Sequence, residues 1–207
     1  MAEWAIVHNV SDPRRFVPPV RASDRVVLDV GCGSGQTLTA HEFRNVREKH
    51  GIDIDAGAID RGRAAFPDLH LAVARAETLP YPSRTFDLVF SRLAWPYADI
   101  PAAAAEALRV LKPGGRLWVA MHVWGMEKER LVAALRDGQL RALFSRAPVL
   151  VNSIAQHISS RPLPLPKLVT RETFQTARGL RSILTRAGFT DITDTRTPTL
   201  IFSARRP

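Results

Sequence analysis

VVLDVGCGSG, residues 26–35, is the most informative stretch of the chain, because a β-prone apolar run with a single acid ends in alternating glycines. This pattern predicts a strand, a tight turn and the start of a helix, which we expect over 34–41. Each glycine has a separate physical role. Gly31 permits the sharp turn after the strand, Gly33 lets a ligand approach bare backbone, and Gly35 lets the next helix pack closely on the strand.

The residues that follow this turn distinguish it from a dinucleotide site. A dinucleotide fingerprint needs a further glycine to seat a pyrophosphate at the helix N-terminus, and Gln36, Thr37 and Leu38 do not supply it. A second short strand, expected over 51–55, carries Asp53 at its carboxyl end. An acid at that place accepts hydrogen bonds from ribose hydroxyls in dinucleotide folds, so the sequence predicts a nucleoside-like ligand without phosphates.

The rest of the chain alternates between helical and strand patterns, which is typical of a doubly wound α/β fold. The first helices end at Pro67 and at the Pro-Gly-Gly turn of residues 113–115, and a late helix ends at Gly188. Beyond the elements above, we expect helices over 56–66, 100–111 and 180–188, and strands over 69–73, 85–91, 116–120, 191–195 and 199–203.

Five motifs stand in a fixed order along the chain: LDVGCGSG at 28–35, GIDI at 51–54, AETLPY at 76–81, FDLV at 86–89 and RVLKPGG at 109–115. Through them, residues 24–125 resemble the class I S-adenosylmethionine-dependent methyltransferases, specifically the group called methyltransferase type 11. The resemblance implies one domain over residues 1–207. It also implies a Rossmann-like, doubly wound sheet of seven strands, mostly parallel, with an antiparallel C-terminal strand.

The resemblance also implies the cofactor S-adenosyl-L-methionine. Ile54 is expected to cover a face of the adenine, and the backbone amide of Ala76 to serve a ring nitrogen. Members of the family often carry an aspartate where Arg75 stands, and its carboxylate accepts a hydrogen bond from the adenine amino group. Arginine has no acceptor, so a backbone carbonyl or another side chain must replace that contact, unless Arg75 points to solvent. The expected cofactor-binding residues are Asp29, Gly31, Gly33, Gly35, Asp53, Ile54, Ala76, Glu77 and Ser91.

Several of these and neighbouring residues have an alternative, purely structural interpretation. Glu77 belongs either to the ligand site or to a loop closed by Leu79 and Pro80. Trp95 either lines the substrate side of the pocket or packs in the core. Cys32, the single cysteine, is more simply explained as a small residue packed in a tight loop than as a reactive thiol.

The acceptor side of the site is less determined. His122, at a strand end beside the expected pocket, is the candidate general base, with a structural role as the alternative. Trp124 and His157 are candidate substrate contacts alongside Trp95. A hydroxyl acceptor needs a base, for which His122, His157 or His8 are available, whereas a neutral amine needs none.

Residues 126–178 do not follow the family core and are expected to form a helical insertion after the fifth strand. They hold nine Lys or Arg and four Asp or Glu, a net charge of +5. A segment at this place is suited to be a substrate lid, because the shared sheet positions the cofactor while variable segments select the acceptor. It is equally suited to be a dimer interface, so the chain is expected to be a monomer or a homodimer.

The overall charge is +9, from 29 basic and 20 acidic residues, which invites a nucleic-acid interpretation. The basic residues are scattered, without a Lys/Arg run and without interleaved aromatic residues, which favours a basic but general surface. No apolar run reaches the roughly 20 residues of a membrane helix, no leader pattern stands at the start, and one cysteine argues against a thiolate metal site. We therefore expect a cytoplasmic protein without a bound metal.

The function predicted from these observations is methyl transfer to an oxygen or nitrogen atom of a small-molecule acceptor. A tRNA or rRNA methyltransferase is the near alternative, and its binding should weaken steeply with salt. A noncatalytic module, in which Arg75 has compromised the adenine site and the insertion binds a protein, is the alternative from another class.

Overall fold

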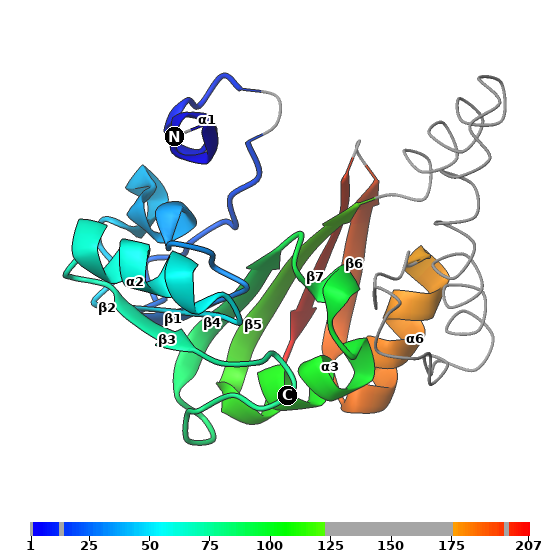
Figure 1. Cartoon of the computed structure of the whole chain (residues 1–207). Coiled ribbons are helices and arrows are strands. Elements are labelled where there is room, and N and C mark those ends of the chain that lie inside the picture. The colour runs from blue at the N-terminus through cyan, green and yellow to red at the C-terminus, as the bar shows by residue number, and fades with distance from the viewer. Residues whose placement is uncertain (1, 13–14, 123–175, 197–198) are drawn as a thin grey trace, which may run out of the picture.

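The computed structural model describes residues 2–12, 15–122, 176–196 and 199–207 (Figure 1). Its centre is one seven-stranded sheet with the order β3-β2-β1-β4-β5-β7-β6. All pairs are parallel except those of β7, which runs antiparallel to both β5 and β6. This confirms the mostly parallel sheet with an antiparallel C-terminal strand. The strands are β1 Val26–Val30, β2 Glu48–Asp53, β3 His70–Val73, β4 Phe86–Arg92, β5 Leu111–His122, β6 Thr190–Arg196 and β7 Thr199–Arg205.

The helices begin and end at recognisable capping residues. The carboxylates of Asp55 and Asp99 accept hydrogen bonds from the amides of Ala58 and Ala102 at the start of α2 (Ala56–Ala65) and α3 (Ile100–Val110). The hydroxyl of Thr176 does the same for α6 (Ala177–Ala187), which ends at Gly188 with a left-handed φ of 103°. A short helix, α1 (Ala2–His8), precedes the sheet.

The helix expected over 34–41 is wrong, because two short 3₁₀ segments stand there: η1 (Gln36–Thr39) and η2 (His41–Phe43). Gly35 provides no side-chain cap, and the Thr39 hydroxyl donates to the carbonyl of Gln36 at 2.7 Å, a local bond that competes with helical pairing. Ala40 is extended, with ψ of 152°, and separates the two segments. The second strand also differs from expectation: it begins at Glu48 and ends at Asp53, against the expected 51–55.

Each face of the sheet has its own apolar core. One core joins β1, β4 and β5 to α3 and α6. Its fully buried side chains include Leu28, Val89, Ala104 and Leu184. Figure 1 shows α3 and α6 side by side over the same part of the sheet. The opposite core joins α2, η1 and η2 to the sheet, and Val7 of α1 is buried in it. Helical elements on both faces make the sheet doubly wound, as predicted. None of the helices in the described ranges is long and apolar enough to span a membrane.

A cluster of rings fixes the outer strands near their amino-terminal half. The ring of His50 in β2 stacks on that of His70 in β3, with centroids 4.7 Å apart, and meets the rings of Tyr81 and Phe86 edge-on at 5.4 Å. Burial lowers the pKa of His50, and the neighbouring His70 lowers it further. The carboxylate of Glu48, 3.7 Å from the ring nitrogen Nε2, opposes this shift without reversing it.

We expect His50 to make the folded state less stable in mild acid. Its pKa is depressed in the folded protein, so between that pKa and the ordinary value of about 6.5 the unfolded chain binds the extra proton. The stability that His50 contributes is therefore present above about pH 6.5 and is lost as the pH falls below it. Urea unfolding of the wild type and of His50→Phe, which keeps a ring without titrating, should show a smaller loss between pH 7.5 and pH 5.5 in the variant. Equal losses would show that His50 is not responsible.

Candidate functional site

The glycine loop leaves β1 in a conformation that side chains rarely adopt. Gly31, Gly33 and Gly35 all have positive φ, of 81°, 56° and 83°. The amides of Gly31 and Cys32 donate to the carbonyl of Ile52 at 2.8 and 2.9 Å, which anchors the loop to the end of β2. The loop therefore stands at the carboxyl edge of the parallel strands, where open α/β sheets bind their ligands.

The three glycines differ in what surrounds them. A Cβ on Gly31 would lie 2.1 Å from the Cβ of Ala94, so the bare backbone of the turn faces the Ala94 methyl group in the segment after β4. A Cβ on Gly35 would lie 2.9 Å from Leu69 Cδ1 and 3.3 Å from Leu71 Cδ2, so Gly35 serves packing against β3 and the residue before it, and not against a following helix as expected. A Cβ on Gly33 would meet nothing within 4 Å, so the backbone there is open to a ligand.

The acid at the end of β2 is bonded directly to this open glycine. Asp53 Oδ2 accepts the amide of Gly33 at 2.8 Å, and its Oδ1 accepts the amide of Asp55 at 2.9 Å. Each carboxylate oxygen has further acceptor capacity, so Asp53 can still accept from a ligand hydroxyl. The two residues predicted from separate motifs are thus brought together at one edge.

A second acid lies beneath the loop. Asp29 is 1% exposed, and its Oδ1 has no hydrogen-bond partner in the described part of the chain. Burial raises the pKa of Asp29 well above its usual range, and the charge of Asp53 raises it further. Burial also raises the pKa of the Cys32 thiol, with Asp29 and Asp53 adding to the shift, which supports the packing interpretation of this cysteine.

Exposed apolar side chains gather at the same carboxyl edge. Ile54 follows Asp53 directly and is 68% exposed, and Val73, the last residue of β3, is 50% exposed. Tyr97, at the end of η3 (Trp95–Tyr97) after β4, is 54% exposed. Ile54 was expected here, whereas Val73 and Tyr97 were not singled out; the position of Val73 at the end of an expected strand was the available signal. Exposed apolar groups at a ligand edge are suited to cover flat or aliphatic parts of a ligand.

The loop after β3 is fixed by a turn and by α3. The amide of Thr78 donates to the carbonyl of Arg75 at 3.2 Å, which closes the turn around Ala76 and Glu77. Glu77 Oε1 accepts the amide of Asp99 at 3.0 Å and Nη2 of Arg75 at 3.1 Å. Burial raises the pKa of Glu77, but the bonds from Asp99 and Arg75 outweigh it and the net shift is downward. Glu77 thus ties the loop to the start of α3, whether or not it also meets a ligand.

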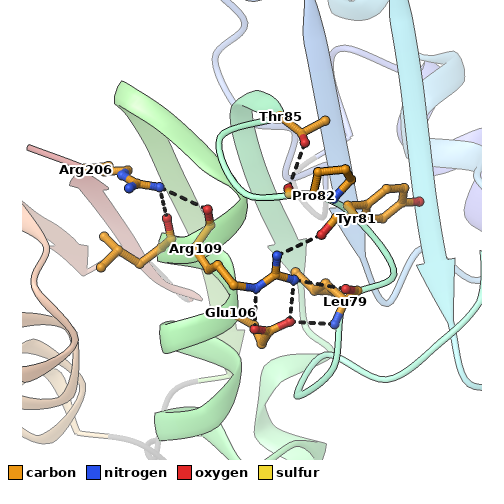
Figure 2. Close-up of polar contacts among 8 residues, drawn as sticks. Leu79, Tyr81, Pro82, Thr85, Glu106, Arg109 and Arg206 are labelled. Atoms are coloured by element: carbon orange, nitrogen blue, oxygen red, sulfur yellow. Dashed lines mark hydrogen bonds and ion pairs between the residues drawn. The ribbon is translucent and has the colours of Figure 1, made fainter.

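A second attachment holds the other end of this loop, as Figure 2 shows. Arg109 on α3 donates to the carbonyls of Leu79 and Tyr81 at 3.0 and 2.8 Å. Its partner Glu106, 2.7 Å from Arg109 Nε, accepts the amide of Leu79 at 2.8 Å. One ion pair therefore satisfies both backbone groups of Leu79, and the loop has little freedom to move relative to the sheet.

Two residues predicted at the end of β4 are buried. The hydroxyl of Ser91 is fully buried and donates to the carbonyl of Val30 at 2.7 Å, so it ties β4 to β1. Trp95 is 1% exposed within the core under α3, which is the packing alternative, and its Nε1 has no partner among the described residues. Between them, Leu93 has a φ of 64°, a strained conformation for a leucine that is frequent near functional sites. Direct ligand contacts of Ser91 and Trp95 stay predictions.

Most of the remaining candidate substrate and base residues lie at the border of the described residues or outside them. His122 is the last residue of β5, with its backbone paired to Thr199. Trp124, His157 and nearly all of the expected insertion at 126–178 lie outside the described residues. His8 is engaged by the protein itself: Nδ1 lies 2.9 Å from the carbonyl of Trp4, and Nε2 lies 3.3 Å from Thr39. The described residues contain no group of three or more His, Cys, Asp or Glu arranged to hold a metal ion.

Comparisons with known proteins agree with this architecture. Residues 28–119 match the family model described as "Methyltransferase domain". An uncharacterised methyltransferase of Mycobacterium bovis is 36% identical over 110 residues, which are 53% of this chain and 44% of that protein. Malonyl-[acyl-carrier protein] O-methyltransferase of Halorhodospira halophila is 39% identical over 108 residues, 49% of this chain and 36% of that protein. The chain thus spans less than half the length of these curated relatives.

Among solved structures, an S-adenosylmethionine-dependent methyltransferase from Mesorhizobium loti superposes with a TM-score of 0.62. The match covers 100% of this chain and 98% of that one at 22% sequence identity. Similarity at this level of identity establishes the fold.

Alanine substitutions at Gly31 and Gly33 should differ in their effect on stability, because Gly31 is closely packed and Gly33 faces open space. Gly31→Ala places a methyl group against Ala94 at a positive φ, and we expect it to destabilise the protein by about 3 kcal/mol or more. Gly33→Ala adds a methyl group in open space, so only the left-handed backbone opposes it, at about 1–2 kcal/mol. Chemical unfolding of both variants measures the difference. Similar losses at the two positions would contradict the close contact of Gly31 with Ala94.

Arg109 should be needed for its two-pronged geometry as well as its charge. Arg109→Lys keeps the charge but cannot reach Leu79, Tyr81 and Glu106 together, and we expect a loss of about 1–3 kcal/mol in the free energy of unfolding. Arg61→Lys, on the exposed surface of α2, is the matched control and should change stability by less than about 0.5 kcal/mol. A loss no greater than in this control would show that the bonds of Figure 2 contribute little.

Proposed function

We propose that the protein transfers the methyl group of S-adenosylmethionine to an oxygen or nitrogen atom of a small-molecule acceptor, because residues 28–119 match the family model described as "Methyltransferase domain" and the fold is that of a known S-adenosylmethionine-dependent methyltransferase. The observation that carries this proposal is the bond between Gly33 and Asp53 at the carboxyl edge. It brings an open backbone position and a ribose-type acceptor together, which is what an adenosyl group requires.

The loop favours a nucleoside ligand over a dinucleotide. A pyrophosphate is held by the amides and dipole at the N-terminus of an α-helix, and here the loop is followed by a 3₁₀ segment of four residues. Beside this loop stands Asp29, whose buried oxygen has no described partner and can accept a hydrogen bond from a ligand donor or water. These features fit a ligand that is polar and contains no phosphate.

Each residue of the edge has a defined task in the proposed function. Asp53 binds the ribose hydroxyls, Gly33 allows close approach, Ile54 covers the base and the amide of Ala76 meets a ring nitrogen. S-adenosylmethionine supplies a methyl group already activated on a sulfonium, with a neutral thioether as the leaving group. The chain therefore needs mainly to align the acceptor and exclude water, and no universal catalytic residue is required.

The need for a base depends on the acceptor. For a hydroxyl acceptor we propose His122, at the end of β5, as the base, with His157 as the second choice. Trp124 is the proposed aromatic contact, because Trp95 is 1% exposed within the core. His8 is less suited, because both of its ring nitrogens already contact the chain. A neutral amine acceptor needs no base.

An RNA acceptor is the second candidate, favoured by the net charge of +9. Exposed arginines such as Arg21, Arg25 and Arg44 are spread over the surface of the described residues. A polyanion would bind with an affinity that falls linearly in log units with the log of the salt concentration, whereas a small neutral acceptor would not. Binding of unmodified tRNA at 50 and 200 mM salt distinguishes the two.

Calorimetric titration with S-adenosylmethionine and S-adenosylhomocysteine tests the proposed function. We expect saturable binding in the micromolar range, weakened about 10–100-fold in Asp53→Ala, because the variant removes the ribose acceptors and the bond to Gly33. Asp60→Ala, an exposed carboxylate on α2, controls for the change of charge and should bind like the wild type. Absence of binding by the wild type, with no thermal stabilisation, would favour the noncatalytic module.

A further inference from the structure

We propose that Arg75 sets the base selectivity of this site, so that the chain accepts a 6-oxopurine nucleoside as well as an adenine nucleoside. This inference rests on the proposed function, since it concerns the base of the same ligand. It follows from the position of Asp53, the proposed ribose ligand, at the end of β2, and from the exposed side chains of Ile54, Val73 and Arg75 next to it.

The base is expected near the ends of β2 and β3. Along the carboxyl edge the strands follow the order β3-β2-β1, with the glycine loop at β1 and Asp53 at β2. If the loop holds the inner part of the ligand and Asp53 its ribose, then the base extends outward to the end of β3. Two exposed aliphatic side chains, Ile54 and Val73, stand there and offer flat apolar cover.

Arg75 offers only hydrogen-bond donors at this place. It lies two residues beyond the end of β3, its side chain is 55% exposed, and its one ion pair within the described ranges is with Glu77 at 3.1 Å. A guanidinium has five N–H donors and no acceptor, so one bond to Glu77 leaves donors for a ligand. An exocyclic amino group is also a donor and cannot bond to Arg75, whereas O6 of a 6-oxopurine is an acceptor. Together with N7, an acceptor that adenine shares, O6 forms the pair that arginine binds bidentately.

The position of Arg75 is fixed. Its carbonyl closes the turn with Thr78, and Glu77, which holds its guanidinium, is bonded to the amide of Asp99 on α3. The following residues are attached to α3 by the Glu106–Arg109 pair. Because the turn cannot shift easily, the choice of base depends on the side chain at position 75 and less on rearrangement of the loop.

The test compares S-adenosylhomocysteine with its deaminated 6-oxo analogue, S-inosylhomocysteine. The two ligands differ at C6, where the amino group becomes a carbonyl, and at N1, where a ring acceptor becomes an N–H donor. Calorimetry gives both dissociation constants for the wild type and for Arg75→Asp, and the readout is the ratio of the 6-oxo to the amino value. We expect a ratio within about threefold of one for the wild type. In Arg75→Asp it should rise at least about tenfold, because a carboxylate accepts from the amino group and repels O6. Contacts made by the backbone of Ala76 are the same in both proteins and cancel in this comparison.

Two further variants complete the design. Arg75→Ala removes the donors without adding an acceptor and should give an intermediate ratio. Arg84→Asp makes the same change of charge at an exposed position before β4, at the opposite edge of the sheet, and should keep the wild-type ratio. Thermal unfolding of each variant establishes that it is folded before its binding is compared.

The outcomes separate the inference from the proposed function. A ratio that is unchanged in Arg75→Asp, or a wild type that already rejects the 6-oxo ligand about a hundredfold, overturns the role of Arg75 while the cofactor assignment stands. A wild type that binds neither ligand overturns both.

Discussion

The contact between the backbone at Gly31 and the Cβ of Ala94 is the constraint on which the ligand edge depends. The chain can leave β1 at a positive φ and pass directly against the segment after β4 only because no side chain stands at Gly31. From this turn the amides of Gly31 and Cys32 reach the carbonyl of Ile52, which brings the loop to the end of β2. Asp53 follows Ile52 directly and can therefore bond Gly33. The tight turn after β1 thus fixes the position of Asp53 at the end of the neighbouring strand β2.

Helix α3 provides the second fixed reference for the edge. Its N-terminal amide at Asp99 holds Glu77, and its last turns hold Leu79 through Glu106 and Arg109. At its other end, Arg206, beyond β7, donates to the carbonyls of Leu108 and Leu111, which have no partner further along the helix. The C-terminal strands therefore stabilise the helix that positions the loop after β3, and distant parts of the sequence support one site.

Much of the fold could be predicted from local patterns, since strands and glycine turns are encoded by neighbouring residues. The mostly parallel sheet follows from apolar runs such as residues 86–92, and the positive φ of Gly33 follows from its place in the glycine turn. The helix expected over 34–41 failed because its start lacks a side-chain cap and Thr39 bonds back to Gln36. A helix cap or a bond from a side chain to a preceding carbonyl depends on single atoms. The periodicity of apolar residues contains no information about such bonds.

The positions of the candidate residues were predictable where a single strand end determines them and less so where distant residues cooperate. Asp53 and Ile54 could be named from a strand end, whereas the attachment of Leu79 to Glu106 and Arg109 joins residues about 30 positions apart. The burial of Trp95 was also undetermined by sequence, because a tryptophan after a strand suits a pocket wall as well as a core. Its exposure depends on how closely α3 packs, which is a property of the whole sheet.

In the proposed function, the part of the edge that binds the ligand is separate from the part that selects its base. Gly31, Gly33 and Asp53 are tied to the sheet by backbone geometry, so a substitution there changes whether a ligand fits at all. Arg75 is fixed in place by the turn and by Glu77, yet more than half of its side chain is exposed, so its chemistry can differ from that of relatives at little cost to the fold. Because α3 holds the loop through Leu79 and Glu77, this freedom does not loosen the site. In the proposed function, selectivity for the base can therefore change by one side chain while Asp53 and Gly33 keep their positions.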